Sequence, residues 1–249
     1  MFQTISNFMR VRDIRNKIIF TLLMLIVFRI GTFIPVPNVD ANVLKAVNEF
    51  NIVGFLNTFG GGALANFSIF AMGIMPYITA SIIVQLLQMD VVPKFAEWSK
   101  QGEVGRRKLA QFTRYFTIVL GFIQSFAMSY GFNAMYGGTL IKDTSIGSYL
   151  TIAIVLTAGT AFLLWLAEQI TAYGVGNGIS IIIFAGIVAA MPNAINQLYA
   201  QKIEGAGDQL FLNIVILLLL LLIILAIVVG VIYVQQALRK IPIQYAKRV

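Results

Sequence analysis

The sequence predicts an all-α, polytopic helical membrane protein with six transmembrane helices and one shorter, re-entrant or plug helix. The first observation is composition: 59% of the 249 residues are hydrophobic and 11% are charged, whereas soluble domains average roughly 25% charged residues. The second is spacing, because apolar runs of about the length that spans a bilayer alternate with shorter polar segments.

Two residue types are missing from the sequence, and their absence limits the catalytic and metal-binding chemistry that the chain can perform. The chain contains neither cysteine nor histidine. This excludes disulfides, thiolate nucleophiles, histidine general bases and the usual zinc and haem ligands. We therefore expect no enzyme activity, no cofactor and no metal site.

The first transmembrane helix is expected over residues 18–34, after a polar N-terminus of residues 1–17. Pro35 and Pro37 end it, and no small-residue cleavage site follows, so it is interpreted as a retained span and not a signal peptide. Arg29 lies inside this run, about 9 Å from its outer end at 1.5 Å per residue. We expect its side chain to snorkel to the membrane surface; a buried functional charge is the alternative.

The next segment, residues 35–66, is predicted to be an external loop that holds a short amphipathic helix at about residues 52–64. Its apolar residues repeat at helical spacing, and the segment is far too short to span a bilayer. They are Ile52, Phe55, Leu56 and Phe59. The glycine triplet Gly60, Gly61 and Gly62 follows, and glycine enters left-handed conformations without steric cost, so we expect the short helix to be loosely attached.

The second span is expected over residues 67–89, with Pro76 near its middle and a kink there. Four further spans are predicted, at residues 115–130, 148–167, 179–191 and 211–234. The segments that connect or follow them are residues 90–114, 131–147, 168–178, 192–210 and 235–249. The glycine-rich segment Gly174 to Gly178 lacks the strand and the Gly-Lys-Ser/Thr of a phosphate loop, and predicts a tight turn with Asn177 capping the next helix.

Basic residues set the predicted orientation. With six spans, fourteen Lys and Arg residues fall on one side and three on the other, and that imbalance shrinks to eleven against six if residues 179–191 do not cross. Because cytoplasmic loops carry the excess of basic residues, we predict six crossings with both termini cytoplasmic. The fourteen are Arg10, Arg12, Arg15, Lys17, Lys94, Lys100, Arg106, Arg107, Lys108, Arg114, Arg239, Lys240, Lys247 and Arg248. Most of the net charge of +8 is therefore attributed to membrane anchoring, not to nucleic acid.

Two pairs of isoleucines lie beside predicted helix breakers. Ile74 and Ile78 flank Pro76, and Ile179 and Ile183 follow the glycine turn; each pair has the i, i+4 spacing of one helical face. Spacing alone favours ordinary helix packing. The sharper hypothesis is a hydrophobic constriction that closes a pore by excluding water.

These residues lie within motifs that closely resemble the SecY family, the channel subunit of the bacterial Sec protein translocase. The motifs are Phe28-Arg29-Ile30-Gly31, Gly60-Gly61-Gly62-Ala63-Leu64, Gly73 to Ile78, Gly105-Arg106-Arg107-Lys108, and Glu168 to Thr171 with Gly176 to Ser180. The resemblance runs from the first span to the tail. It implies the N-terminal half of an inverted-repeat channel, with six of the family's ten spans, from a truncated or split chain.

The resemblance also implies roles for individual residues. It places the pore ring at Ile74, Ile78, Ile179 and Ile183, and the plug at about residues 52–64. It places the lateral gate at Thr79, Ile82 and Gln124. We expect the basic residues Arg106, Arg107, Lys108, Arg239, Lys240, Lys247 and Arg248 to help dock a partner.

The partners that the resemblance implies are SecE, SecG, the SecA ATPase, the ribosome, signal sequences and translocating polypeptides, together with anionic lipids. No nucleic acid other than ribosomal RNA is expected. The implied location is the bacterial plasma membrane. Two rival classes stay open: half of a dimerising solute transporter, which predicts a buried ionisable residue, and a non-conducting membrane scaffold.

Overall fold

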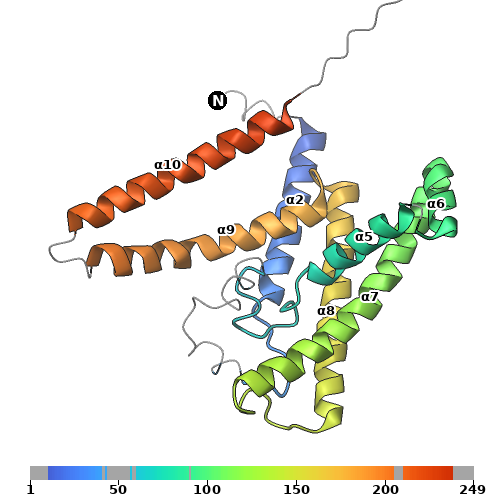
Figure 1. Ribbon diagram of the computed structural model, residues 1–249, viewed down its shortest axis with the longest axis horizontal. Coiled ribbons are helices and arrows are strands. Elements are labelled where there is room, and N and C mark those ends of the chain that lie inside the picture. The colour runs from blue at the N-terminus through green and yellow to red at the C-terminus, as the bar shows by residue number, and fades with distance from the viewer. Residues whose placement is uncertain are drawn as a thin grey trace, which may run out of the picture. The chain divides into compact units, whose positions relative to one another are not determined.

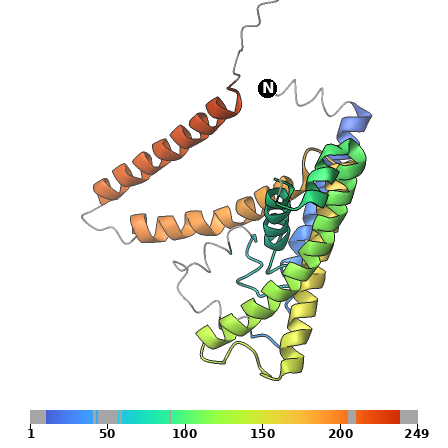
Figure 2. The ribbon, with the colours of Figure 1, turned by 45° about the vertical axis from the view of Figure 1, so that its right-hand side comes forward.

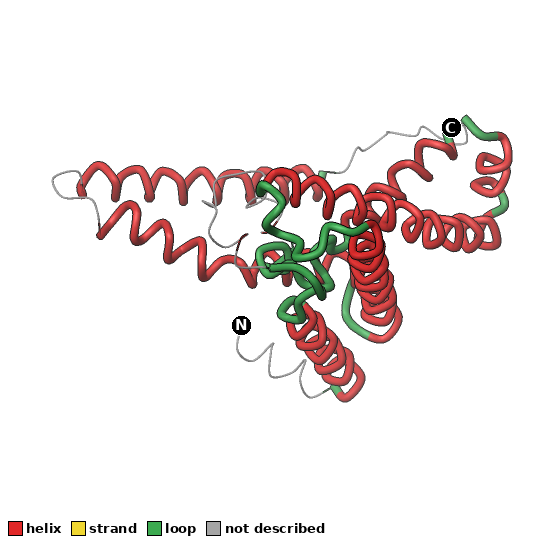
Figure 3. Tube along the Cα trace, turned by 90° about the horizontal axis from the view of Figure 1, so that it is seen from below, coloured by secondary structure: helices red, strands yellow, loops and turns green. Residues whose placement is uncertain are grey.

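The computed structural model describes residues 11–40, 43, 57, 60–89, 91–204 and 210–237. No residue in these ranges lies in a β-strand, and Figure 3 shows only helices and loops there, so the all-α prediction is confirmed. The helices (Figure 1) are α2 Arg12–Gly31, α5 Met75–Gln88, α6 Pro93–Lys100, α7 Gly102–Met135, α8 Ile146–Tyr173, α9 Gly178–Tyr199, the π-helix η1 Ala200–Glu204 and α10 Leu210–Gln235. The chain forms two compact units, residues 1–191 and 192–249.

Four of the described helices are long and apolar enough to cross a membrane: those that begin at Gly102, Ile146, Gly178 and Leu210. The α5 and α6 helices together form a fifth candidate, bent by 92° between them. The α2 helix is not among them, because Arg15, Lys17 and Arg29 fall in every eighteen-residue window of it. Six crossings therefore remain a prediction, although a helix lies at each of the six predicted positions.

The helix expected from Phe67 begins only at Met75, and the residues from Gly60 to Ile74 form successive turns. Pro76 consequently lies in the first turn of α5, so the predicted kink at Pro76 is wrong. The first turn tolerates proline because its N–H groups have no partner within the helix.

The basic segment 90–114 is helical, whereas the sequence predicted a loop. It contains α6 and the first turns of α7, a helix of 34 residues. Its charged residues in α7 are exposed, and among them Glu103 and Arg107 form an i, i+4 ion pair with 2.7 Å between their side-chain atoms. Such a pair stabilises a solvent-exposed helix. A high density of charged residues is therefore compatible with a helix and does not by itself predict a loop.

The α7 and α8 helices run antiparallel and side by side (Figure 2), and together they form the scaffold of the first unit. At one end Arg114 Nε lies 2.5 Å from Glu168 Oε1, and at the other Asn133 Nδ2 donates to the Tyr149 hydroxyl at 2.7 Å. The buried positions of α7 recur every fourth residue and are mostly small or polar, which allows close helix packing. They are Gly105, Leu109, Thr113, Thr117, Gly121, Ser125, Ser129 and Asn133.

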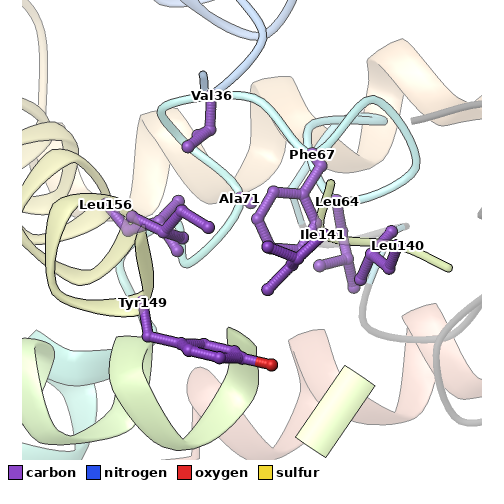
Figure 4. Close-up of a cluster of buried hydrophobic side chains, with 9 residues drawn as sticks. Val36, Leu64, Phe67, Ala71, Leu140, Ile141, Tyr149 and Leu156 are labelled. Atoms are coloured by element: carbon purple, nitrogen blue, oxygen red, sulfur yellow. The ribbon is translucent and has the colours of Figure 1, made fainter. Parts of the chain in front are cut away.

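The segment between Gly60 and Ile74 packs its apolar side chains against α8. Phe67 is fully buried in one cluster with Leu156 and Tyr149 (Figure 4), and Phe70 stacks between Phe28 and Phe162. Backbone bonds tie the segment to the residues that follow α2, from Val36 N to Phe67 O and from Ile69 N to Ile34 O, both at 3.0 Å. Tertiary contacts therefore satisfy a backbone that is not helical.

The second unit contains α10, none of whose residues is buried within the described structure. It is a charge-free apolar helix of 26 residues. Asn213 near its start donates from Nδ2 to Lys202 O at 3.1 Å and so links α10 to η1.

Candidate functional site

Three of the four predicted pore-ring residues line one cavity in the first unit. Ile74, Ile78 and Ile183 enclose it, together with Gly60, Leu64, Met128 and the apolar residues 71–75, and its volume is about 420 Å³. Every described residue that lines it is apolar or glycine. Ile179 does not line the cavity; it lies one helical turn before Ile183 and packs against the Phe28 and Phe70 cluster.

The two isoleucines of α5 project from its first turn. Gly73 has a φ of +55°, and Ile74 is the N-cap residue, with Ile78 N donating to Ile74 O at 3.1 Å. Ile74 is only 6% exposed and Ile78 is partly exposed, so Ile74 contributes to the core as well as to the cavity wall. The proline beside them is buried and fixes the direction in which α5 starts.

The start of α9 is held by a cap and by two threonines. Asn177 Oδ1 accepts hydrogen bonds from Ile179 N at 3.0 Å and Ser180 N at 3.4 Å, which confirms the predicted cap. Thr171 Oγ1 accepts from Gly178 N at 2.9 Å, and Thr21 Oγ1 of α2 accepts from Val175 N at 3.1 Å. Nothing in the sequence distinguished Thr21, whose partner lies 154 residues further on.

Gly178 lets α9 begin directly against α8. An ideal Cβ at this position would lie 1.9 Å from Ala167 O, closer than any side chain tolerates. A glycine is therefore required for the backbones to meet here. The cap, the threonine bonds and this contact together fix the position of Ile183.

The glycine triplet is held from both sides. Gly61 and Gly62 have φ angles of +63° and +89°, as expected for glycine in left-handed conformations. The Gly61 backbone packs on α9, where an ideal Cβ would meet Gly186 Cα at 3.1 Å. Arg29 Nη1 of α2 donates to Gly61 O at 2.6 Å.

The partly buried guanidinium of Arg29 therefore has an acceptor inside the protein, and the snorkelling of its side chain stays a prediction. Four residues of the predicted plug, Ile52, Phe55, Leu56 and Phe59, lie outside the described residues. The role of the plug consequently stays a prediction.

The residues predicted for the lateral gate lie on two helices that pack together, α5 and α7. Thr79 donates from Oγ1 to Met75 O at 3.1 Å, Ile82 is 52% exposed one turn further on, and Gln124 is partly exposed on α7. Their assignment as a gate remains a prediction.

The basic residues Arg106, Arg107 and Lys108 are all exposed in the first turns of α7. Arg107 also lines a groove of about 570 Å³ between α7 and α8, beside the Arg114 and Glu168 ion pair. The other predicted docking residues, Arg239, Lys240, Lys247 and Arg248, lie outside the described residues.

Comparison with known proteins places the chain in a family. The sequence model of the family described as SecY matches residues 68–249, most of the chain. The chain belongs to the SecY family. Its membership and its apolar helices make it a multi-pass membrane protein.

Relatives in this family are highly similar in sequence. The SecY protein translocase subunits of Bacillus licheniformis and Bacillus subtilis are 76% and 71% identical over 247 residues. That of Staphylococcus carnosus is 58% identical over 249 residues. The matches cover 99–100% of this chain and 57–58% of these relatives, so the chain spans little more than half of their length.

Two solved structures share the SecY fold. One is described as the structure of a protein-conducting channel. Its match covers 76% of this chain and 38% of the channel's chain, with a TM-score of 0.51 and 19% sequence identity. Sec61 in a canine ribosome–channel complex from the endoplasmic reticulum matches 93% of this chain and 50% of its own, with a TM-score of 0.53 and 21% identity. At these identities the likeness concerns the fold alone.

Proposed function

We propose that this chain forms part of the central, protein-conducting channel subunit of a Sec translocase. It passes unfolded secretory polypeptides across the membrane and releases membrane segments sideways into the lipid. Membership of the SecY family supports this proposal. The observation that carries it is the apolar cavity where Ile74 and Ile78 of α5 meet Ile183 of α9.

An apolar wall suits a channel that must pass any polypeptide sequence. Branched side chains hold no ion and exclude water, so they resist leakage of small solutes at rest. They also carry no fixed charge that would bind or repel particular segments. A solute transporter of the rival class places an ionisable residue at its binding site, and none of the described residues that line this cavity is ionisable.

We propose that the segment before the glycine triplet is the plug, which closes the cavity from outside. Gly60, the first residue of the triplet, lines the cavity, so movement at the triplet changes the cavity wall directly. Thr79, Ile82 and Gln124 are proposed as part of the lateral gate through which signal sequences reach the lipid.

We further propose that the chain works without catalysis, in the bacterial plasma membrane, with both termini in the cytoplasm. SecE, SecG, the SecA ATPase and the ribosome are the proposed partners, and anionic lipids the proposed membrane contacts. The exposed cluster from Arg106 to Lys108 supports cytoplasmic docking. The ribosome is favoured by the canine Sec61 structure, which was solved in a ribosome–channel complex.

Resting ion leak tests the proposed pore. Ile78 and Ile183 are partly exposed cavity residues, so Ile78→Ser with Ile183→Ser in the full-length channel removes apolar wall without emptying the core. We expect ion leak from proteoliposomes to rise several-fold while the protein stays folded.

The matched control is Ile123→Ser with Ile154→Ser, two isoleucines that are 57% and 59% exposed and do not line the cavity. This control should leave the leak unchanged. Equal leak in the two double variants, or no leak in either, would contradict the proposal.

A further inference from the structure

Arg29 is a charged residue in the apolar part of α2, and such residues are costly in a membrane-spanning helix unless they have partners. Within the described residues, no ion pair involves Arg29. Its bonding partner is a backbone carbonyl, that of Gly61, at 2.6 Å from Nη1. The guanidinium carbon also lies 4.7 Å from the centre of the Phe33 ring, and the negative face of that ring attracts the cation.

The bond to Arg29 differs from the other hydrogen bonds of the glycine triplet. Gly62 N donates to Asn57 O, Ala63 N to Gly60 O and Asn66 N to Gly62 O, all between near neighbours. Among the described residues, the bond from Arg29 is the one that reaches the triplet from another element, 32 residues away. The turns that follow are already tied to the residues after α2 through Phe67 and Ile69.

The other side of Gly61 leaves no room for a side chain. An ideal Cβ would lie 3.1 Å from Gly186 Cα and 3.7 Å from Ala189 Cβ, both on α9. The Gly61 peptide therefore lies between the guanidinium from α2 and the backbone of α9. Both contacts must loosen before the triplet can change its conformation.

We propose that Arg29 is a positioning residue that latches the glycine triplet in its resting conformation. This inference rests on the proposed function, in which the segment before the triplet is the plug. The bond opens through movement of α2 or α9.

The latch requires the shape of arginine as well as its charge. One N–H of the planar guanidinium donates to the carbonyl while its face rests over Phe33. A lysine keeps the charge but presents a flexible ammonium with a stronger hydration shell. Arg29→Lys is therefore expected to restore part of the latch, and Arg29→Gln none of it.

Hydrogen–deuterium exchange tests the latch independently of transport. The full-length channel in lipid nanodiscs is compared with its Arg29→Gln and Arg29→Lys variants, and exchange is followed in peptides that cover residues 60–66. We expect Arg29→Gln to raise the exchange rate of the Gly62, Ala63 and Asn66 amides about tenfold, and Arg29→Lys to raise it less. Arg15→Gln, about 21 Å away along the same helix at 1.5 Å per residue, is the matched control and should change nothing there.

Two further readings keep the test decisive. Hydrogen–deuterium exchange in α7 and α8 reports whether each variant is folded. If Arg29→Gln raises exchange in these helices, Phe33→Leu is used in its place. It removes the ring beneath the guanidinium and should raise exchange at residues 60–66 by a smaller factor. Unchanged exchange at residues 60–66 in the folded variant would overturn the inference.

Ion leak from proteoliposomes of the same variants separates the latch from the plug. Increased exchange with a several-fold rise in leak, partly reversed in Arg29→Lys, supports both. Increased exchange without any leak keeps the latch and refutes the proposed role of the plug.

Discussion

The contact between Gly178 and Ala167 O gives the sharpest stability prediction. A Cβ in Gly178→Ala would lie 1.9 Å from that carbonyl oxygen, whereas real Cβ atoms stay beyond 3.0 Å. Because the obstacle is backbone, the start of α9 must move by about 1 Å. Overpacking of this kind costs about 1–3 kcal/mol. The bond from Gly178 N to Thr171 Oγ1 is weakened as well, which adds about 0.5–1.5 kcal/mol.

We therefore expect Gly178→Ala to lower the free energy of unfolding by about 2–4 kcal/mol. The assay is equilibrium denaturation of the purified full-length protein in detergent, followed by intrinsic fluorescence. Gly131→Ala in α7 is the matched control, because nothing lies within 4 Å of its ideal Cβ. Alanine should stabilise that helix by about 0.5–1 kcal/mol. If the two variants are equally stable, the close packing of α9 on α8 is not what fixes the start of α9.

Three further predictions concern other residues. Asn177→Ala removes the cap of α9 and should lower the free energy of unfolding by about 1 kcal/mol in the same assay. Asn177→Asp should retain most of that stability. An unchanged free energy of unfolding in Asn177→Ala would show that the cap is dispensable. Hydrogen bonds from the Ser145 hydroxyl and amide and from Ser148 hold the pKa of Asp143 below its ordinary value of 3.8. Their stabilisation of the start of α8 is therefore present above pH 3.8 and lost as the pH falls through the lowered pKa, so amide exchange there should rise in acid, and Asp143→Asn should abolish this pH dependence. Arg106→Glu with Arg107→Glu should weaken binding of SecA or ribosomes to the full-length channel at unchanged topology; unaltered affinity would leave these residues a topological role only.

Hydropathy predicted where helices lie but not where each begins. Residues 67–74 are as apolar as a membrane helix, yet they are apolar because Phe67 and Phe70 are buried in the core. Two of the hydrogen bonds that satisfy this backbone join it to Ile34 and Val36, and no local pattern in the sequence indicates these two. In contrast, the Asn177 cap was predictable, since its partners lie two and three residues away.

In the candidate site too, local features were predictable from the sequence and tertiary contacts were not. The i, i+4 spacing placed Ile74 with Ile78 and Ile179 with Ile183, but spacing could not indicate that Ile179 packs into the core while Ile183 reaches the cavity. For Arg29, its distance from the helix end favoured snorkelling. Its hydrogen bond to Gly61 could not be predicted, because only the folded chain brings the two residues together.

Photo-crosslinking of a polypeptide arrested during translocation tests the central claim most directly. A photoreactive residue is placed at Ile78 or Ile183, which line the cavity, or at Ile154, which is exposed on α8 away from it. In the full-length channel we predict crosslinks to the translocating chain from Ile78 and Ile183 and none from Ile154. Equal crosslinking from all three positions, or none from Ile78 and Ile183, would contradict the assignment of this cavity to the pore.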